Sequence, residues 1–398
     1  MTGRLGRLHQ IWRAIPPAPR RAALRALTLA AAPRADATPP TSSAGAVIAG
    51  EMARISGLGE AARLLHAGLA SLGADRGAVE LGVLRPPIPT TLPEDAALIL
   101  HVNAPSIPLM LARAEKNFLR GRRVIGFWNW ELESLPKNWR RAEQFVHDIW
   151  TPSAFTKAAI ETIYPGRVRL VPYPLASLDL APAMPDRASI GLPDHAVIVT
   201  VIANLGASFA RKNPLGAIAA HRAAFGNRAD RILVLKLAGG DAFPGDMGRV
   251  RAAIGDAGNI RLIDETWPGE KLRTLLAGTD ILLSPHRAEG FGLVPAEAML
   301  RGIAVVATGW SGNLQFMDET SAGLVPYRLI PVADDRGDYD VKGAVWAEPD
   351  IDEAASLLRR LADDPARRIE LALRGQAYAR AALGLDPLES ALTANGIG

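Results

Sequence analysis

The sequence of 398 residues contains no cysteine, few aromatic residues and no strong excess of charge of either sign. The absence of cysteine excludes disulfides, thiolate metal sites and cysteine nucleophiles, and it leaves the redox compartment undetermined. A formal net charge of +4 at pH 7 is too small to indicate nucleic-acid binding, and no recognised motif suggests it, so we expect no nucleic-acid partner. No uninterrupted run of about 18 apolar residues occurs, which argues against a membrane-spanning helix.

What the sequence does contain is enough apolar material for two domains, since 48% of its residues are hydrophobic. Short apolar runs alternate with helical patterns along most of the chain, and Ala196–Ile202 is a run of β-branched and small residues typical of a buried parallel strand. This alternation predicts an α/β fold built of βα units, with two doubly wound sheets.

The N-terminal segment differs from the rest, because seven arginines precede the first acidic residue, Asp36. Leu5, Leu8, Trp12 and Ile15 recur at helical spacing and form one apolar stripe beside arginines. We predict a basic extension over residues 1–44, and residues 1–36 are a candidate for contact with an anionic membrane surface. A helix packed on the domain, a frayed tail and an organellar transit peptide are the alternatives.

The most informative stretch is Asp280–Asn313, which contains two apolar runs and two turns rich in small residues. Ile281–Leu283 reads as a buried strand, the turn around Gly290 and Gly292 follows, and a helix is predicted from Pro295 with Glu297 in its first turn. A strand, a glycine turn and a helix N-terminus together make an anion site, because free backbone N–H groups point at the ligand.

Two carboxylates, Glu289 and Glu297, flank this predicted anion site. Carboxylates repel phosphate but accept hydrogen bonds from neutral hydroxyls. A ligand that offers a diphosphate to backbone amides and hydroxyls to carboxylates is a nucleotide sugar. The alternative is that both glutamates are helix-start residues stabilised by the helix dipole.

With its context, SPHRAEGFGLVPAEAM followed by VVATGWSGN, this E-x7-E pattern resembles the signature of the retaining GT-B glycosyltransferases of the large family-4 type. That family includes bacterial mannosyl-, rhamnosyl- and glucosyltransferases of polysaccharide assembly, and the resemblance extends over residues 95–380. It implies two Rossmann-like domains facing each other across a cleft. It also implies that Glu289 contacts hydroxyls of the donor sugar and Glu297 the ribose, and that the sugar–phosphate position is lined by Gly290, Phe291, Gly292 and Leu293.

The same resemblance divides the chain into an acceptor-side domain over residues 45–183 and a nucleotide-sugar-binding domain over 187–377. It places a C-terminal helix, residues 378–398, across the first domain.

Arg211 and Lys212 are adjacent cations directly before a predicted helix, Leu215–Phe225. Cations beside a helix N-terminus oppose its dipole, so they gain most if an anion lies between. We therefore predict that they clamp the diphosphate of the donor, and a solvated basic turn is the alternative. Lys236, inside a predicted buried strand, is a candidate for a further cation of this clamp, because an unpaired buried lysine is energetically costly.

Gly57 and Gly59 match, with Ala62, the G-x-G-x-x-A fingerprint of dinucleotide-binding folds. An NAD(P)-dependent oxidoreductase is therefore the rival function, although the segment Glu51–Arg54 lies between the predicted strand, Gly45–Ala49, and these glycines. The resemblance implies instead a glycine turn that borders the donor phosphates. His101 ends a predicted strand, Ala97–His101, and resembles a family histidine near the donor sugar, while a structural histidine is the alternative.

Two further motifs contain acidic residues. The WELE segment, which contains Glu131 and Glu133, occurs in a branch of the same family and indicates a glutamate on the acceptor side, or alternatively buried tryptophans with solvated glutamates. Asp338-Tyr-Asp340 mimics the D-x-D metal motif of another glycosyltransferase fold, but it stands in a polar loop and is predicted to be solvated.

Together these features predict a metal-independent, retaining hexosyltransferase with no cofactor. Its expected partners are a nucleoside-diphosphate sugar, with GDP-mannose slightly favoured, and a glycan or lipid-linked saccharide acceptor of cell-surface polysaccharide synthesis. The expected location is the cytoplasm, at the inner face of the cytoplasmic membrane if residues 1–36 bind lipid. A non-catalytic nucleotide-sugar-binding partner of another enzyme is the remaining alternative.

Overall fold

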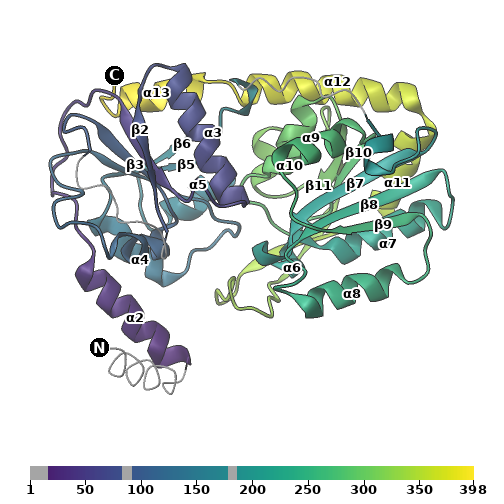
Figure 1. The fold of residues 1–398 in the computed structure, drawn as a ribbon, viewed down its shortest axis with the longest axis horizontal. Helices are drawn as coiled ribbons and strands as arrows, with labels where there is room; N and C mark the ends of the chain where they lie inside the picture. The colour runs from purple at the N-terminus through teal and green to yellow at the C-terminus, as the bar shows by residue number, and fades with distance from the viewer. Residues whose placement is uncertain (1–16, 83–91, 178–185) are drawn as a thin grey trace. The chain divides into compact units, whose positions relative to one another are not determined.

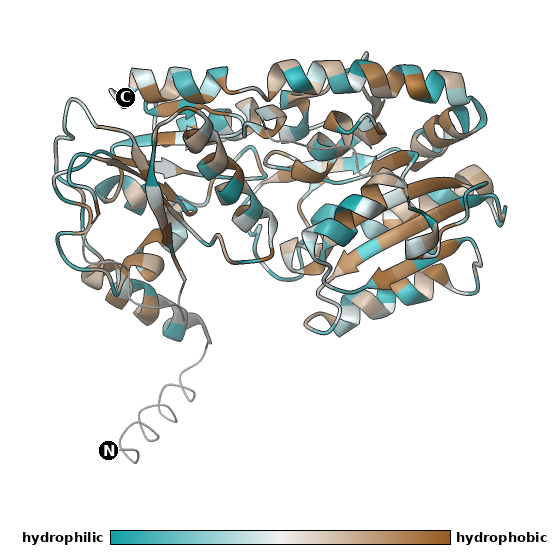
Figure 2. Ribbon diagram, turned by 45° about the horizontal axis from the view of Figure 1, so that its top comes forward, coloured by the Kyte–Doolittle hydropathy of each residue, from teal (hydrophilic) through white to brown (hydrophobic). Residues whose placement is uncertain are grey.

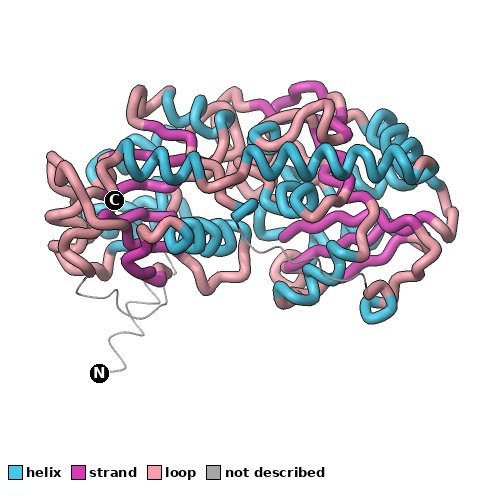
Figure 3. The backbone as a smooth tube through the Cα atoms, turned by 90° about the horizontal axis from the view of Figure 1, so that it is seen from above, coloured by secondary structure: helices cyan, strands magenta, loops and turns pink. Residues whose placement is uncertain are grey.

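The computed structural model describes residues 17–82, 92–177 and 186–398, so the predicted stripe of Leu5 to Ile15 lies outside the described residues. Within the described residues, two six-stranded sheets and one two-stranded sheet form the β-structure, and helices surround them (Figures 1 and 3). The predicted α/β fold with two parallel sheets is confirmed. Among the described residues, no helix is long and apolar enough to cross a membrane.

The first sheet has the strand order β2-β1-β3-β4-β5-β6. Its strands, in chain order, are β1 (Ala46–Gly50), β2 (Asp75–Glu80), β3 (Ala97–His101), β4 (Val124–Phe127), β5 (Asp148–Thr151) and β6 (Val168–Leu170). The central strands β1 and β3 are buried along their whole length, which explains their uniformly apolar sequences. β2 lies at the edge of the sheet and is only partly buried, so its sequence has no continuous apolar run.

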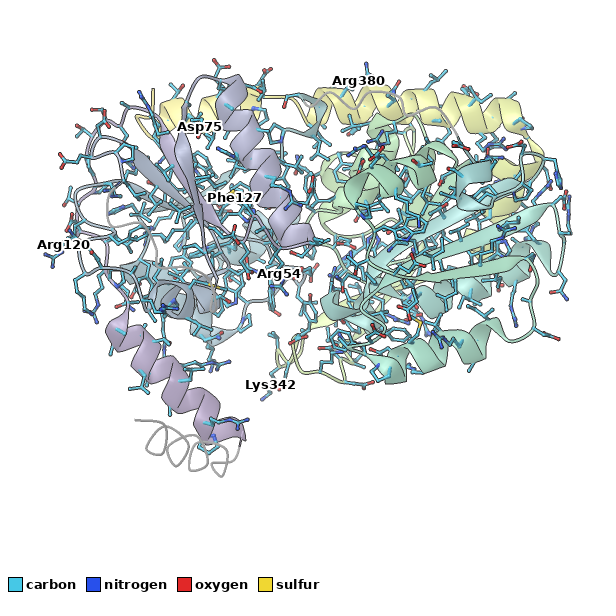
Figure 4. All side chains as sticks on the ribbon, in the orientation of Figure 1. Arg54, Asp75, Arg120, Phe127, Lys342 and Arg380 are labelled. Carbon is cyan, nitrogen blue, oxygen red and sulfur yellow. The ribbon has the colours of Figure 1, made fainter. Side chains whose placement is uncertain are left out.

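The helices of the N-terminal part include two long ones and several short ones. They are α2 (Pro17–Ala31), α3 (Gly57–Ser71), α4 (Ile107–Leu111) and α5 (Ala154–Glu161), with 3₁₀ turns at Ala104–Ser106 and Lys137–Gln144. Ser56 caps α3, because its side chain accepts a hydrogen bond from the Gly59 amide at 3.2 Å. In Figure 4, Arg54 marks the turn that leads into α3, and the buried Phe127 lies within the first sheet.

The second sheet has the order β12-β11-β10-β7-β8-β9. Its strands are β7 (Val197–Asn204), β8 (Arg231–Ala238), β9 (Ile260–Asp264), β10 (Ile281–Ser284), β11 (Ala304–Thr308) and β12 (Gly323–Val325). The helices that follow them are α6 (Phe209–Lys212), α7 (Pro214–Phe225), α8 (Pro244–Ile254), α9 (Gly269–Ala277), α10 (Leu293–Leu300), α11 (Ile351–Asp363) and α12 (Pro365–Ala382). The last helix of the chain is α13 (Asp386–Ala394).

Helices cover both faces of the second sheet, as the alternation along β8 shows. Leu233, Leu235 and Leu237 share a core with side chains of α7, α8 and α11, whereas Ile232 and Val234 pack with Leu275 of α9. The sheet therefore has two apolar faces, and its strands are among the most hydrophobic ribbons in Figure 2.

An antiparallel hairpin, which was not predicted from the sequence, follows β12 along the chain. Its strands are β13 (Tyr327–Pro331) and β14 (Val345–Pro349), with Leu329 opposite Ala347. The connection between them, residues 332–344, contains the Asp338–Asp340 motif.

The chain divides into two compact units. The first comprises Met1–Trp128, Lys137–Trp150 and Leu392–Gly398, and the second comprises Asn129–Pro136 and Thr151–Ala391. The C-terminal residues join the first unit through Trp150, whose indole donates to the Asn395 side chain at 3.1 Å, and through a bridge between Ser43 and Ile397. Residues 392–398, which include the last turn of α13, group with this unit, whereas α12 and the first part of α13 group with the second.

Candidate active site

The turn between β10 and α10 is built for close approach of backbone. Gly292 caps α10 with a φ of +98°, a conformation that favours glycine. A Cβ at Gly312 would lie 2.2 Å from the carbonyl oxygen of Gly290, so only glycine fits there. Ser153 and Thr156 donate to the same carbonyl at 2.6 and 3.2 Å. The turn is thus held from two sides, and the first amides of α10 are those that a helix leaves unpaired.

Glu289 and Arg211 form the buried centre of the site. The guanidinium of Arg211 donates to Glu289 Oε2 at 3.2 Å and to the carbonyls of Ala288 and Ala207 at 2.8 and 2.9 Å. Lys212 donates from Nζ to Glu289 Oε1, and its side chain remains 23% exposed. The structure therefore brings the three predicted residues together, and the anion that lies between the two cations is Glu289 itself.

The electrostatics of this group keep Glu289 ionised. Burial by itself raises the pKa of Glu289, but the positive charges of Lys212 and Arg211 outweigh it and lower the pKa to about 2. Burial also lowers the pKa of Lys212, and the nearby Glu289 opposes that change. For Arg211, burial is outweighed by contacts that include Tyr339 and Glu289, so its pKa rises.

A second turn, Thr308–Asn313, supports the first. Ser311, at a φ of +83°, accepts a hydrogen bond from the Glu289 amide at 2.9 Å. The buried His286 lies 3.0 Å from Asn313 Oδ1, and Thr308 donates to the His286 carbonyl at 2.6 Å. Ser311 and Asn313 belong to the small-residue turn visible in the sequence, whereas no sequence signal identified His286.

The remaining residues of the glycine turn occupy different environments. Phe291 is buried, with ring centroids 5.1 Å from Tyr173 and 5.0 Å from Phe316. Leu293 is the first residue of α10, so the helix begins two residues earlier than expected, and Glu297 falls in its second turn. Glu297 forms an ion pair with Arg301 at 2.9 Å and is half-buried.

Lys236 makes its hydrogen bond outside the Glu289 group. Its Nζ donates to the carbonyl of Glu265 at 2.6 Å and lies 5.5 Å from the ring centroid of Trp267. Burial lowers its pKa. The lysine is thus satisfied at the end of β9, and its role in a diphosphate clamp stays a prediction.

Three predicted residues lie in the first unit. His101 ends β3, is buried, and stacks on Phe127 with ring centroids 5.1 Å apart. Burial lowers the pKa of His101 to about 4, so the side chain is neutral at pH 7. A Cβ at Gly59 would lie 2.2 Å from the Arg54 carbonyl, whereas Gly57 has open space around it. Gly59 is therefore required by the turn before α3.

The acidic loop is only partly solvated, in contrast to the prediction. Asp338 and Asp340 are exposed, but Tyr339 between them is buried, because its ring packs against aromatic side chains. Within residues 17–82, 92–177 and 186–398, no group of three or more His, Cys, Asp or Glu side chains is arranged to hold a metal ion.

Known proteins resemble this chain in two respects: in the sequence of residues 199–337 and in the fold of most of the chain. Residues 199–337, which contain Arg211, Lys212, Glu289 and Glu297, match the family described as glycosyl transferases group 1. No curated protein matches the chain in sequence.

Solved structures resemble the chain over most of its length. Sucrose-phosphate synthase from Thermosynechococcus elongatus is 17% identical, with 88% of this chain and 98% of that chain covered and a TM-score of 0.62. Anabaena HepE in complex with UDP and glucose is 13% identical, with 88% and 99% covered and a TM-score of 0.63. WaaG, a glycosyltransferase involved in lipopolysaccharide biosynthesis, is 15% identical, with 87% and 99% covered and a TM-score of 0.55. Residues 199–337 are therefore similar in sequence to the glycosyl transferases group 1 family, and the chain has the two-domain α/β fold of GT-B glycosyltransferases.

Proposed function

We propose that this protein is a glycosyltransferase that uses a nucleoside-diphosphate sugar. The observation that carries the proposal is the contact of Glu289 with both Arg211 and Lys212 beside the N-terminus of α10. Backbone amides and Lys212 suit a diphosphate, and the carboxylate of Glu289 suits sugar hydroxyls. The match of residues 199–337 to a glycosyltransferase family supports the same reading.

In the proposed mechanism the diphosphate leaves while the anomeric carbon becomes oxocarbenium-like. Lys212, Arg211 and the N-terminus of α10 stabilise the charge that develops on the leaving group. Glu289 is held ionised and orients the donor sugar through its hydroxyls. The resemblance to retaining enzymes motivates attack from the same face without a metal, with the leaving phosphate accepting the acceptor's proton.

The proposed acceptor is a glycan or lipid-linked saccharide of cell-surface polysaccharide synthesis, at the inner face of the cytoplasmic membrane. Its support is the arginine-rich sequence of residues 1–36 and the similarity in fold to WaaG, which acts in lipopolysaccharide biosynthesis. Deletion of residues 1–36 should reduce binding to anionic vesicles, with activity on a soluble acceptor retained. Unchanged vesicle binding would refute the membrane contact.

The first test is thermal stabilisation by GDP, UDP, dTDP, ADP, NAD and NADP, because a ligand that binds the folded state raises the midpoint. We expect one nucleoside diphosphate to stabilise the protein and Glu297→Ala to remove that effect. Stabilisation by NAD or NADP alone would favour an oxidoreductase that uses Gly57 and Gly59. Binding of a nucleotide sugar without turnover by any acceptor would favour a non-catalytic partner.

A further inference from the structure

The segment Asn129–Pro136 groups with the second unit and lies beside the glycine turn. A Cβ on Gly290 would come within 3.1 Å of the Trp130 carbonyl oxygen. Thr156 donates to that Trp130 carbonyl at 2.8 Å and to the Gly290 carbonyl at 3.2 Å, so one hydroxyl ties the two backbones together. Glu131 is therefore placed next to the Glu289–Gly290 turn although more than 150 residues separate them in sequence.

Glu131 is one of two glutamates in this segment, and their environments differ. Glu131 is half-buried, whereas Glu133 is exposed. The phenol of Tyr339 lies within reach of the Glu131 carboxylate, and burial is the largest cause that raises the pKa of Tyr339 well above its ordinary value. The phenol therefore stays protonated and is available as a donor to the carboxylate.

The ring of Tyr339 is fixed on several sides. Its centroid lies 5.6 Å from that of Trp130 and 6.5 Å from that of Trp346, and the Arg211 guanidinium carbon lies 5.8 Å from it. Packing at these distances leaves the hydroxyl little freedom, so the phenol presents a fixed donor to Glu131.

The connection that carries Tyr339 is itself anchored to the α6 region. Asp334 accepts hydrogen bonds from the Ser208 hydroxyl at 3.1 Å and from the Asp338 amide at 2.8 Å. Arg336 donates to the Leu205 carbonyl at 2.5 Å, and its guanidinium carbon lies 3.7 Å from the ring centroid of Phe243. Residues 332–344 are therefore anchored to the rest of the second unit by hydrogen bonds and packing. This anchoring fixes the position of Tyr339, which lies within the segment.

Glu131 acts electrostatically on the same cations as Glu289. Its negative charge favours the protonated forms of both Arg211 and Lys212. A carboxylate has about four acceptor positions, and one hydrogen bond from Tyr339 leaves capacity for hydroxyl donors. Because Glu131 is only half-buried, a ligand at the Glu289 turn can reach it.

We infer that Glu131 is a second sugar-binding carboxylate, which accepts hydrogen bonds from hydroxyls of the donor sugar, and that Tyr339 is its positioning residue. The inference rests on the proposed function, because it assigns a site to the sugar of the nucleotide sugar. Segment 129–131 lies beside the Gly290 turn, where the proposed diphosphate site begins. The sugar attached to that diphosphate is the donor sugar, so we assign Glu131 to it rather than to the acceptor.

The experiment compares binding of a nucleoside diphosphate with binding of the matching nucleotide sugar, using UDP with UDP-glucose and GDP with GDP-mannose. Calorimetry is performed on the full chain and on Glu131→Gln, Tyr339→Phe, the double variant and Glu133→Gln as the matched control. Tyr339→Phe keeps the ring and removes only the donor, and circular dichroism and the melting midpoint confirm folding.

We expect Glu131→Gln to weaken binding of the nucleotide sugar about tenfold or more while leaving that of the nucleoside diphosphate within about twofold. Tyr339→Phe should show a smaller loss of the same kind, seen in turnover as a raised KM for the donor, and the double variant should equal Glu131→Gln because the two residues act through one carboxylate. Glu133→Gln should match wild type.

If Glu131→Gln binds the nucleotide sugar as wild type does, the inference is overturned and the proposed function is not. The same holds if the variant loses equal affinity for the nucleotide sugar and the nucleoside diphosphate. Additive losses in the double variant would overturn the positioning role of Tyr339. Wild-type protein that binds neither ligand of either pair would overturn the proposed function, and the inference with it.

Discussion

Glu289 accepts a hydrogen bond from Lys212 at one carboxylate oxygen while Lys212 stays the most exposed member of the buried group. Arg211, by contrast, is 5% exposed and is occupied by two carbonyls as well as the carboxylate. The two adjacent cations therefore have different tasks: Arg211 fixes the turn, and Lys212 is the one that can meet a ligand.

Lys212→Ala should weaken binding of the nucleoside diphosphate about tenfold to hundredfold, as expected for loss of a hydrogen bond to a charged group. The fold should persist, because Arg211 still pairs with Glu289. Calorimetric titration measures the loss, with Lys157→Ala, which removes an ion pair on α5, as the control. Equal affinities for Lys212→Ala and wild type would show that Lys212 does not contact the ligand.

Arg211→Lys should instead destabilise the protein by about 2 kcal/mol, because a lysine leaves buried carbonyl acceptors unpaired. Urea unfolding at pH 7 measures the change in the free energy of unfolding. A variant as stable as wild type but deficient in ligand binding would contradict the structural task assigned to Arg211.

The stability that Glu289 contributes to the fold should depend on pH. Its pKa is lowered from 4.5 to about 2, so the folded protein gains stability from the carboxylate above pH 4.5 and loses it as the pH falls toward 2. The stability gap between wild type and Glu289→Gln should shrink by about 2 kcal/mol between pH 5 and pH 3, measured by urea unfolding. A constant gap over that range would contradict the ion pairs.

His101 should make stability depend on pH in a higher range. Burial lowers its pKa from 6.5 to about 4. At pH values between about 4 and 6.5, His101 is therefore protonated in the unfolded chain and neutral in the folded protein. Stability should fall by about 3 kcal/mol from this source as the pH drops from 7 to 4, and His101→Gln should remove that part of the slope. His221, whose pKa burial also lowers to about 4, supplies a separate slope that His101→Gln should leave intact.

Gly312→Ala should lower ligand affinity by displacing the Gly290 carbonyl, which its Cβ would approach to 2.2 Å. Overpacking of this kind costs about 1–3 kcal/mol in stability. Gly245→Ala is the matched control, because a Cβ in α8 meets nothing within 4 Å. Helix propensity should make that variant as stable as wild type or more stable. Intact binding by Gly312→Ala would show that the turn tolerates the shift.

The alternation of strands and helices, and most strands of the second sheet, could be predicted from the sequence. Apolar runs such as Ile281–Leu283 mark strands because parallel strands are buried on both faces. Arg211, Lys212 and Glu289 were each identified through a family resemblance and through the placement of each residue before a helix or in a turn, but the contact of Glu289 with both cations was not predicted.

Other parts of the site left no local signal. Tyr339 stands among aspartates, and its burial depends on Trp130 and Trp346, which are distant in sequence. Lys236 was identified from its position in a predicted strand, but its hydrogen bond to the Glu265 carbonyl could not be predicted from the sequence. β13 and β14 were missed because the outer face of such a hairpin carries polar and exposed residues. Each miss reflects a tertiary partner that no short window of sequence contains.

The return of residues 392–398 to the first unit has a consequence for synthesis of the protein. Gly398 donates from its amide to the Ser43 carbonyl at 3.0 Å, and Ser43 donates to Gly396 at 2.8 Å. At a rate of about 5–20 residues per second, on the order of ten seconds or more separates emergence of Ser43 from that of its partners. The first unit to be translated is therefore completed after the second, and during that interval the backbone of Ser43 depends on water or a chaperone for its hydrogen bonds.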